Sequence, residues 1–375
     1  MIYLDNAATS LKKTNEVLEA VEEAMVKYTA NAGRGAYKVA QDISIKMMET
    51  RENINNFFGG KYKVIFTPSC SFALNLAIRG YAKPNIHIIT TYLEHNSVLR
   101  TLEYLRQKGI ITYTILSDLS KKSFLKNIRN NTKLIITTHV SNVTGERVDT
   151  SMVSKICKNY NIKYLLDTAQ GAGHIPFDVD ADMIAFAGHK GFKGLIGVSG
   201  LLVKEQIKLN PVFFGGTGTS SLDLNQPNEQ VEDFEVGSQS GVLISALNAG
   251  VVYTKNNIDE ICKKENFLTQ YLIKKLDECD FLDRYYTPNN CYSVVSFNIK
   301  NIDSSLVGDM LNEDYDICVR TGFHCAPLVH VHKDTTNIGM VRASLNEYNN
   351  VSEIDEFVDA IKDINNRLKY NKQRN

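Results

Sequence analysis

The chain has 375 residues, enough for one large enzyme domain with a smaller one, or for two mid-sized domains. Lys plus Arg and Asp plus Glu number 42 each, so no chain-wide field points to nucleic acid or a charged membrane surface as a partner. We therefore expect the partner to be a small molecule or another protein.

The first residues read MIYLDNAATS and continue polar, without the basic start and apolar stretch of a signal peptide. No later segment is apolar for about 18 residues, the length that a membrane span requires. These features predict a cytoplasmic protein. The seven cysteines are scattered and never form CxxC, which favours reduced thiols over a disulfide framework or a zinc site. Any cysteine chemistry would then be catalytic.

Between about residues 60 and 205, short apolar runs rich in β-branched residues alternate with helical patterns. The expected strands are 64–67, 86–91, 111–116, 133–140, 164–169 and 182–188, and the expected helices include 74–81, 98–109 and 151–160. This alternation predicts an α/β fold with a mainly parallel sheet. Ligands of such sheets bind beyond the carboxyl ends of the strands, so the polar residues there are candidates for a site.

The region from about residue 255 onward has a different pattern. A helix is expected at 255–278, strands near 292–299 and 317–320, and a closing helix at 352–369. We interpret this region as a smaller α+β domain. The predicted division is a large domain of residues 15–254 and a small domain of residues 1–14 and 255–375.

Two segments that follow strands could contact a cofactor. Residues 68–71 join a strand to a helix, and the free amides of a helix N-terminus can hold a phosphate, although an ordinary capped helix start is the alternative. His95 also lies between a strand and a helix. Taken alone, it is more simply a cap or a surface residue.

Asp167 ends a run of aliphatic residues, and Gln170 follows shortly after it. A carboxylate at a buried strand end needs a cationic partner or several donors, and a protonated pyridine nitrogen would serve, with helix capping as the alternative. The next strand ends at His189 and Lys190, among glycines. A lysine in a loop is ordinarily a surface residue, but it forms a Schiff base where its surroundings lower its pKa.

The order strand, Asp, Gln, strand, His, Lys is specific, and further motifs accompany it along nearly the whole chain. These are YLDNAATS at 3, NAGRGAY at 31, EHNSV at 94, SNVTGE at 141, LLDTAQGAGHIPFDVD at 165, GHK at 188, FFGGTGTSS at 213, FEVGSQSG at 234, RTGFHCAP at 320 and VRASLNEYN at 341. The chain thus resembles fold type I pyridoxal-phosphate enzymes of the class V aminotransferase group, and within it the group II cysteine desulfurases and selenocysteine lyases. The resemblance implies a mainly parallel seven-stranded sheet in the large domain and a smaller α+β C-terminal domain.

The resemblance also implies a cofactor site for pyridoxal 5'-phosphate. Lys190 would carry the cofactor as a Schiff base, Asp167 would pair with the ring nitrogen, and His95 would stack on the ring. The remaining implied contacts are Gln170 at the ring oxygen, and Cys70, Ser71 and His189 near the phosphate. A homodimer is implied as well, with the segment around Gly237 and Ser238 reaching the phosphate of the neighbouring subunit.

Cys325 lies in a loop after a short strand, next to His324. One cysteine among seven is ordinarily an inert thiol, but this position matches the desulfurase nucleophile, whereas Cys318 is expected to be structural. Positive neighbours would raise the thiolate fraction. In an extended segment adjacent side chains point to opposite sides, so His324 need not touch the thiol.

The substrate residues implied by the resemblance are Arg342, Asn142 and Arg34. Arg342 would clamp the substrate carboxylate through its planar fork of donors. Asn142 would lie near cofactor and substrate, and Arg34 is a further candidate. In the implied reaction Lys190 shuttles a proton, the Cys325 thiolate takes sulfur from L-cysteine, alanine leaves, and a thiol or a protein accepts the sulfur from the persulfide.

Some positions depart from the group II pattern. Ala187 stands where a serine or threonine usually contacts the phosphate, Phe72 replaces a glutamate, Phe323 replaces the first histidine of the cysteine loop, and that loop is one residue shorter before its proline. The resemblance therefore does not fix the substrate or the reaction. The alternatives are L-selenocysteine, another class V activity in which Cys325 is incidental (an aminotransferase, β-lyase or epimerase), and a non-catalytic sulfur carrier or scaffold.

Overall fold

The computed structural model describes residues 1–32, 35–218 and 221–374, with side chains up to residue 370, and it divides into two compact units. The large unit comprises residues 12–139 and 148–258, and the small unit comprises residues 1–11, 140–147 and 259–375. Segment 140–147 belongs to the small unit, although it lies inside the range that the sequence assigned to the large domain. The border near residue 258 falls within one long helix.

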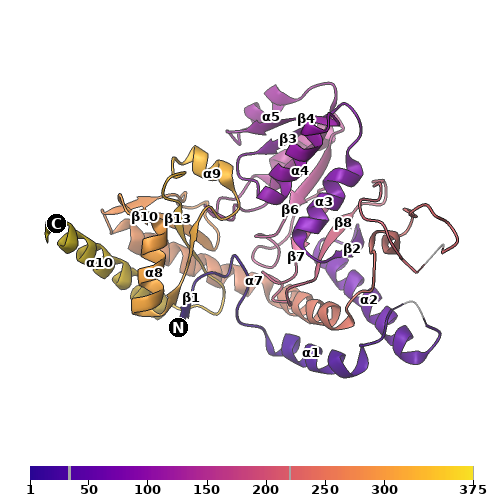
Figure 1. The fold of residues 1–375 in the computed structure, drawn as a ribbon, viewed down its shortest axis with the longest axis horizontal. Helices are drawn as coiled ribbons and strands as arrows, with labels where there is room; N and C mark the ends of the chain where they lie inside the picture. Colours follow the sequence, from indigo (N-terminus) through magenta and orange to yellow (C-terminus); the bar gives the residue numbers. More distant parts are fainter. Residues whose placement is uncertain (33–34, 219–220, 375) are drawn as a thin grey trace. The chain divides into compact units, whose positions relative to one another are not determined.

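A seven-stranded sheet forms the centre of the large unit (Figure 1). Its strands, in spatial order, are β2 (Lys63–Thr67), β8 (Ser199–Val203), β7 (Met183–Ala187), β6 (Lys163–Asp167), β5 (Thr132–Thr138), β3 (Ile86–Thr91) and β4 (Ile111–Leu116). β8 runs antiparallel to both of its neighbours, and the other pairs are parallel. The predicted α/β class and mainly parallel sheet are confirmed.

Helices make up much of the rest of the large unit. They are α1 (Asn15–Lys27), α2 (Lys38–Phe57), α3 (Cys70–Tyr81), α4 (Asn96–Gln107), α5 (Lys121–Asn127), α6 (Thr150–Tyr160), the short 3₁₀ helix η1 (Val231–Phe234) and the first half of α7 (Gly241–Asp277). The apolar faces of α3 and α4 pack with the sheet in one hydrophobic cluster. Each begins at a capping side chain: the Ser69 hydroxyl accepts from the Phe72 amide, and His95 Nδ1 accepts from the Ser97 amide.

The small unit contains two sheets. β1 (Ile2–Tyr3) pairs in parallel with β11 (Ile317–Cys318), and the four-stranded antiparallel sheet has the order β12 (Arg320–Gly322), β13 (Met340–Ser344), β10 (Val294–Ile299) and β9 (Leu282–Arg284). Its helices are α8 (Ser304–Tyr315), α9 (Pro327–His332), α10 (Val351–Arg374) and the second half of α7. Strands and helices share one core, in which Phe297 and Phe357 are fully buried.

The expected helix at 255–278 is longer than predicted, because α7 begins at Gly241. Glycine is a poor helix former, and two glycines in residues 241–254 weaken the helical signal there. Close packing requires one of them: a Cβ atom on Gly250 would lie 1.9 Å from the Phe192 carbonyl oxygen.

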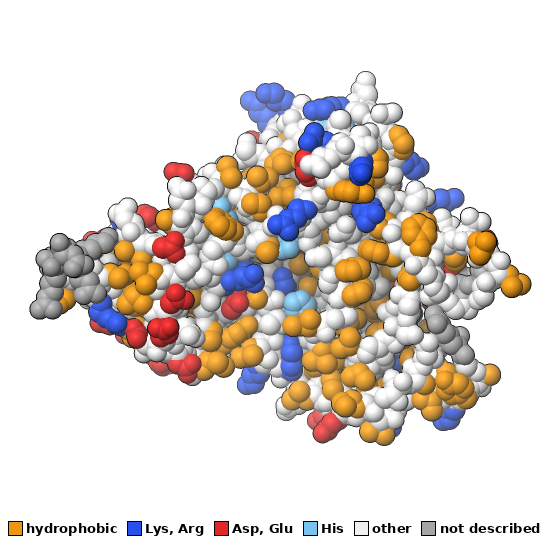
Figure 2. Space-filling view, viewed as in Figure 1, with side chains coloured by type: hydrophobic (Ala, Val, Ile, Leu, Met, Phe, Trp, Pro, Cys, Tyr) orange, Lys and Arg blue, Asp and Glu red, His pale blue; other side chains and the backbone are white. Residues whose placement is uncertain are grey.

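Among the described residues, no helix combines the length and apolar composition needed to cross a bilayer. The surface of the large unit is nevertheless apolar in one area. Figure 2 shows hydrophobic side chains gathered over α1 and α2. The exposed members are Leu18, Met25 and Val26 of α1, and Val39, Ile45 and Met48 of α2. We refer to these six residues as the α1–α2 apolar face.

Candidate active site

Asp167 is the last residue of β6 and is 3% exposed. Its Oδ1 accepts a hydrogen bond from the Ala169 amide at 2.9 Å, and the Cys70 thiol donates to the same oxygen at 3.7 Å. Burial raises the pKa of Asp167, an effect that the Ala169 hydrogen bond and the nearby Lys190 charge oppose. A buried carboxylate of this kind is stabilised by an additional cation.

Lys190 and His189 follow β7 and are both half-buried. Burial, together with the charges of Lys190 and Lys13, lowers the pKa of His189 to about 4. The imidazole is therefore neutral near pH 7. Burial and the Asp167 charge raise the pKa of the Cys70 thiol well above its ordinary value, so Cys70 is a protonated donor in this cluster and not a nucleophile.

His95 is the N-cap of α4, so the capping role considered from the sequence is real. Its Nδ1 lies 2.9 Å from the Ser97 hydroxyl, which is 2.6 Å from the hydroxyl of Ser71 in the first turn of α3. These contacts fix the plane of the imidazole ring. They also bring the starts of α3 and α4 together through side chains.

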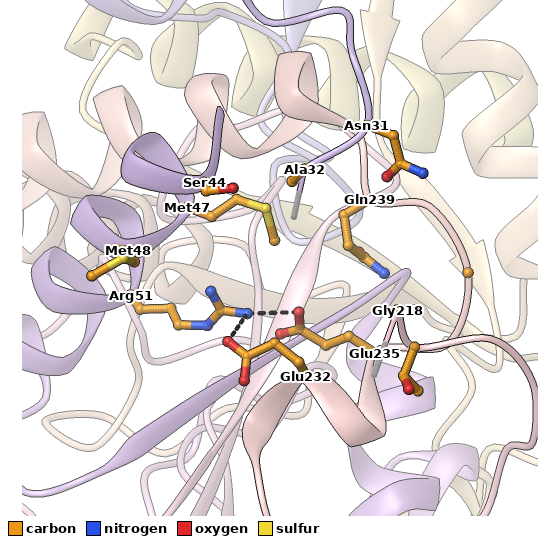
Figure 3. A pocket seen from close by; sticks show the side chains of 12 residues that line it. Asn31, Ala32, Ser44, Met47, Met48, Arg51, Gly218, Glu232, Glu235 and Gln239 are labelled. Atoms are coloured by element: carbon orange, nitrogen blue, oxygen red, sulfur yellow. Dashed lines mark hydrogen bonds and ion pairs between the residues drawn. The ribbon is translucent and has the colours of Figure 1, made fainter. Parts of the chain in front are cut away.

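Gln170 and Ser238 also lie in the large unit. Gln170 is 7% exposed, just after β6. The Ser238 hydroxyl accepts a hydrogen bond from the Asn31 amide at 3.1 Å. Its neighbours Gly237 and Gln239 line a hollow of about 220 Å³ beside α2, shown in Figure 3.

An ion pair stabilises the wall of this hollow (Figure 3). Arg51 Nη2 lies 2.6 Å from Glu235 Oε2 and 3.6 Å from Glu232 Oε1. Glu235 is 5% exposed and also accepts from the Phe66 amide at 2.7 Å. Burial raises the pKa of Glu235 to about 7, although Arg51 opposes this. Through these contacts Glu235 connects the segment before Ser238 to Arg51 of α2 and to Phe66 of β2.

Three ionisable side chains near this cluster were not identified from the sequence. Glu94, next to His95, is fully buried and its pKa is raised to about 8, mainly by burial. Lys193 is fully buried in a left-handed conformation with φ of +58°, and its Nζ donates to the Gly191 carbonyl at 2.7 Å. Burial and the Lys193 charge lower the pKa of Lys13 to about 8. The "EHN" and "FKG" stretches contain two of these residues, but burial cannot be read from a single sequence.

Arg342 lies on β13 of the small unit and is 2% exposed. Its Nη2 forms an ion pair with Asp5 Oδ1 at 2.6 Å, and its Nη1 donates to the Asn142 carbonyl at 2.9 Å. Nε has no hydrogen-bond partner among the described residues. A buried guanidinium that retains an unused donor is suited to bind a further carboxylate. Asp5 was not singled out from the sequence, where it appears only within the YLDNAATS motif.

Cys325 is the exposed cysteine of the chain, and the other six are buried or half-buried. The expectation of an extended segment is wrong. His324 and Cys325 have φ values of +48° and +58°, so the chain turns here. His324 is 4% exposed, and burial lowers its pKa to about 2, with the nearby Arg342 charge contributing. This histidine is therefore not a positive neighbour of the thiol.

The large-unit residues fit pyridoxal phosphate by their chemistry. A ring cation would offset the burial of Asp167, Lys190 supplies an amine nearby, and the exposed Ser71 hydroxyl in the first turn of α3 suits a phosphate. Arg34 lies outside the described residues. The roles of all these residues stay predictions.

Comparison with known proteins agrees with this reading. The family model for class V aminotransferases matches residues 2–357. A probable cysteine desulfurase of Methanothermobacter thermautotrophicus is 31% identical, over 97% of this chain and 94% of the relative. A probable cysteine desulfurase of Pyrococcus abyssi is 32% identical, with the same coverage.

The fold matches solved structures as well. The apo structure of cysteine desulfurase from Thermococcus onnurineus has a TM-score of 0.88 and is 32% identical, covering 97% of this chain and 94% of that one. The Escherichia coli cysteine desulfurase CsdA has a TM-score of 0.86 at 22% identity, covering 98% of this chain and 94% of that one, and so supports the fold alone. The chain belongs to the class V aminotransferase family.

Proposed function

We propose that this protein is a pyridoxal-phosphate-dependent cysteine desulfurase, which converts L-cysteine to L-alanine and retains the sulfur as a persulfide on Cys325. One structural observation carries the proposal beyond the family. The exposed Cys325 thiol lies on a turn that Asn142 connects by hydrogen bonds to the buried Arg342, which supports assigning the nucleophile and the carboxylate-binding cation to these two residues.

The large-unit residues are assigned to the cofactor. Lys190 is the attachment residue, and Asp167 is the partner of the ring nitrogen. His95 is placed against the ring, and Gln170, Cys70, Ser71, His189 and Ser238 are assigned to the remaining polar groups of the cofactor. When bound, pyridoxal phosphate supplies an electron sink that makes the α-proton of an attached amino acid acidic. The Lys190 amine accepts that proton and later returns it.

The small-unit residues are assigned to the substrate. Arg342 binds the carboxylate of L-cysteine, and Asn142 supplies a neighbouring amide. The Cys325 thiolate attacks the substrate sulfur: a sulfur–sulfur bond forms, the carbon–sulfur bond breaks, and the electron pair stays on carbon, which takes up a proton to yield alanine. A thiol or a protein then removes the outer sulfur from the exposed persulfide. The exposure of Cys325 is what makes that removal feasible.

Turnover of cofactor-loaded protein tests this proposal. Wild type, Cys325→Ser and Cys318→Ser are supplied with L-cysteine or L-selenocysteine and a reductant, and alanine, sulfide and selenide are measured. Cys318→Ser is the matched control because Cys318 is half-buried in β11 of the same unit. The expected result is equimolar alanine and sulfide from wild type and control, and loss of both in Cys325→Ser, with its yellow colour retained.

Other outcomes would replace the proposal. Unchanged sulfide release by Cys325→Ser would remove the nucleophile assignment. Turnover of L-selenocysteine alone would make the protein a selenocysteine lyase, and transamination of a keto acid without sulfide would make it an aminotransferase. A colourless protein that does not bind pyridoxal phosphate would favour a carrier or scaffold.

We also propose a homodimer formed through the α1–α2 apolar face. Six apolar side chains that are each more than 40% exposed on two neighbouring helices are unusual for the surface of a monomer. A charge introduced there, as in Met25→Glu, is expected to shift the molecular mass measured by light scattering toward that of a monomer. An unchanged mass would place the interface elsewhere, or would show that the wild type is monomeric.

A further inference from the structure

The turn that carries Cys325 has a strained backbone. We refer to residues 322–326 as the cysteine turn. Gly322, His324 and Cys325 have φ values of +92°, +48° and +58°. For a residue with a side chain, the left-handed conformation is unfavourable, and it persists only where the surroundings hold it. Two such residues in succession therefore require strong local anchors.

The side chain of His324 is one anchor. Its Nε2 lies 3.1 Å from the Met340 carbonyl oxygen on β13. Because a carbonyl only accepts, Nε2 is the donor and Nδ1 is unprotonated. Burial, with Arg342 and His330 nearby, holds the pKa of His324 at about 2, so this bonding pattern is constant through the neutral pH range. Such a weak base cannot take the proton of a thiol.

The main chain of His324 forms the second anchor. The Asn142 side-chain amide donates to the His324 carbonyl oxygen at 2.5 Å. Asn142 lies in a segment that is itself held to β10, because the Ser296 hydroxyl donates to the Val143 carbonyl at 2.5 Å. A third hydrogen bond, from the Ala326 amide to the Phe323 carbonyl at 3.1 Å, closes the turn.

We propose that His324 is a positioning residue for Cys325: its buried imidazole, bonded to the Met340 carbonyl, fixes the left-handed turn that presents the thiol. This inference rests on the proposed function, because it concerns the thiol that would attack the substrate sulfur. Both anchors also connect to Arg342, since Met340 is two residues before it on β13 and the Asn142 carbonyl accepts from its Nη1. The Cys325 thiol is thus held at a fixed position relative to Arg342, the residue proposed to bind the carboxylate.

A simple structural role is the alternative, in which His324 only fills space in the core. The two roles predict different kinetics. A positioning residue affects the rate of sulfur transfer and leaves binding of L-cysteine to Arg342 intact. A space-filling residue affects stability and the packing around Arg342, and so it affects binding of L-cysteine as well as the rate.

The experiment compares cofactor-loaded wild type, His324→Ala, His324→Gln and the control His332→Ala, which changes an exposed histidine on α9. Glutamine can still donate to the Met340 carbonyl. Three quantities are measured: amide hydrogen exchange in residues 322–326, the single-turnover rate of persulfide formation, and KM for L-cysteine.

The expected result for His324→Ala is a rise of about ten-fold in exchange, as for one lost hydrogen bond, and a fall of about ten-fold or more in the persulfide rate, with KM within about two-fold of wild type. His324→Gln recovers most of both changes, and His332→Ala resembles wild type. Unchanged exchange in His324→Ala would overturn the inference. So would a rate loss that glutamine does not recover and that comes with higher KM and lower melting temperature.

Failure of the proposed function would look different. If Cys325→Ser released sulfur at the wild-type rate, the thiol would not be the nucleophile. The exchange measurement would still decide whether His324 holds the turn, because it does not depend on activity.

Discussion

Glu94 is a buried carboxyl group whose ionisation should limit stability at alkaline pH. It is fully buried; its Oε1 accepts from the Thr91 hydroxyl at 2.6 Å and from the Thr138 amide at 3.0 Å. Oε2 has no hydrogen-bond partner among the described residues. Burial is the main cause that raises its pKa from 4.5 to about 8, and the Asp167 charge adds to it. We therefore expect Glu94 to be protonated at neutral pH.

The folded state binds this proton more tightly than the unfolded state. The contribution of Glu94 to stability is therefore complete below about pH 4.5, and it is lost as the pH rises to about 8. The difference of about 3.5 between the two pKa values corresponds to on the order of 5 kcal/mol. The glutamine of Glu94→Gln cannot ionise, so this variant does not lose stability in this way as the pH rises. Its amide NH₂ would lack a partner, which costs roughly 1–3 kcal/mol at every pH.

The variant should therefore be less stable than wild type near pH 5 and more stable near pH 9, with the two curves crossing between. Urea unfolding of both proteins at intervals from pH 5 to pH 9 measures this. A constant difference in the free energy of unfolding across the whole range would contradict this expectation, because it would mean that Glu94 does not titrate between pH 5 and pH 9.

Three further substitutions have expected outcomes. Asp5→Asn leaves the Arg342 guanidinium buried without its ion-pair partner at 2.6 Å, and should lower the free energy of unfolding by about 3 kcal/mol in urea titrations; a change below about 1 kcal/mol would contradict this. Arg342→Lys keeps the charge but loses the planar fork, and should raise KM for L-cysteine by about ten-fold or more in steady-state assays; an unchanged KM would remove the carboxylate assignment. Ser69→Ala removes the cap that accepts from the Phe72 amide at 3.3 Å, and should lower the free energy of unfolding by about 1 kcal/mol; no loss would show that the cap is replaced by other contacts.

The large unit was predictable from the sequence because its signals are local. Aliphatic runs bounded by turn residues predict β3, β5, β6 and β7, and Asp167 and Lys190 follow directly from the ends of two such runs. β8 was not among the expected strands, although its five residues are all buried.

The small unit was less predictable because its features depend on distant residues. β13 contains Arg342, and a charged residue in a fully buried five-residue strand hides the apolar pattern. The pairing of this arginine with Asp5 joins positions that are far apart in sequence, and the tie between Asn142 and His324 does the same. The burial of His324 likewise has no local signal. Sequence motifs therefore indicated the candidate site residues, but not the hydrogen bonds and ion pairs that hold their side chains in place.

The proposed function depends above all on Cys325 receiving the sulfur of L-cysteine. The most direct test is a single turnover of cofactor-loaded protein with equimolar L-cysteine and no reductant, followed by peptide mass spectrometry and quantification of alanine. We expect one added sulfur on the Cys325 peptide, none on the other cysteine peptides, and one alanine for each persulfide. Alanine formed without added sulfur on Cys325, or sulfur found on a different cysteine, would contradict it.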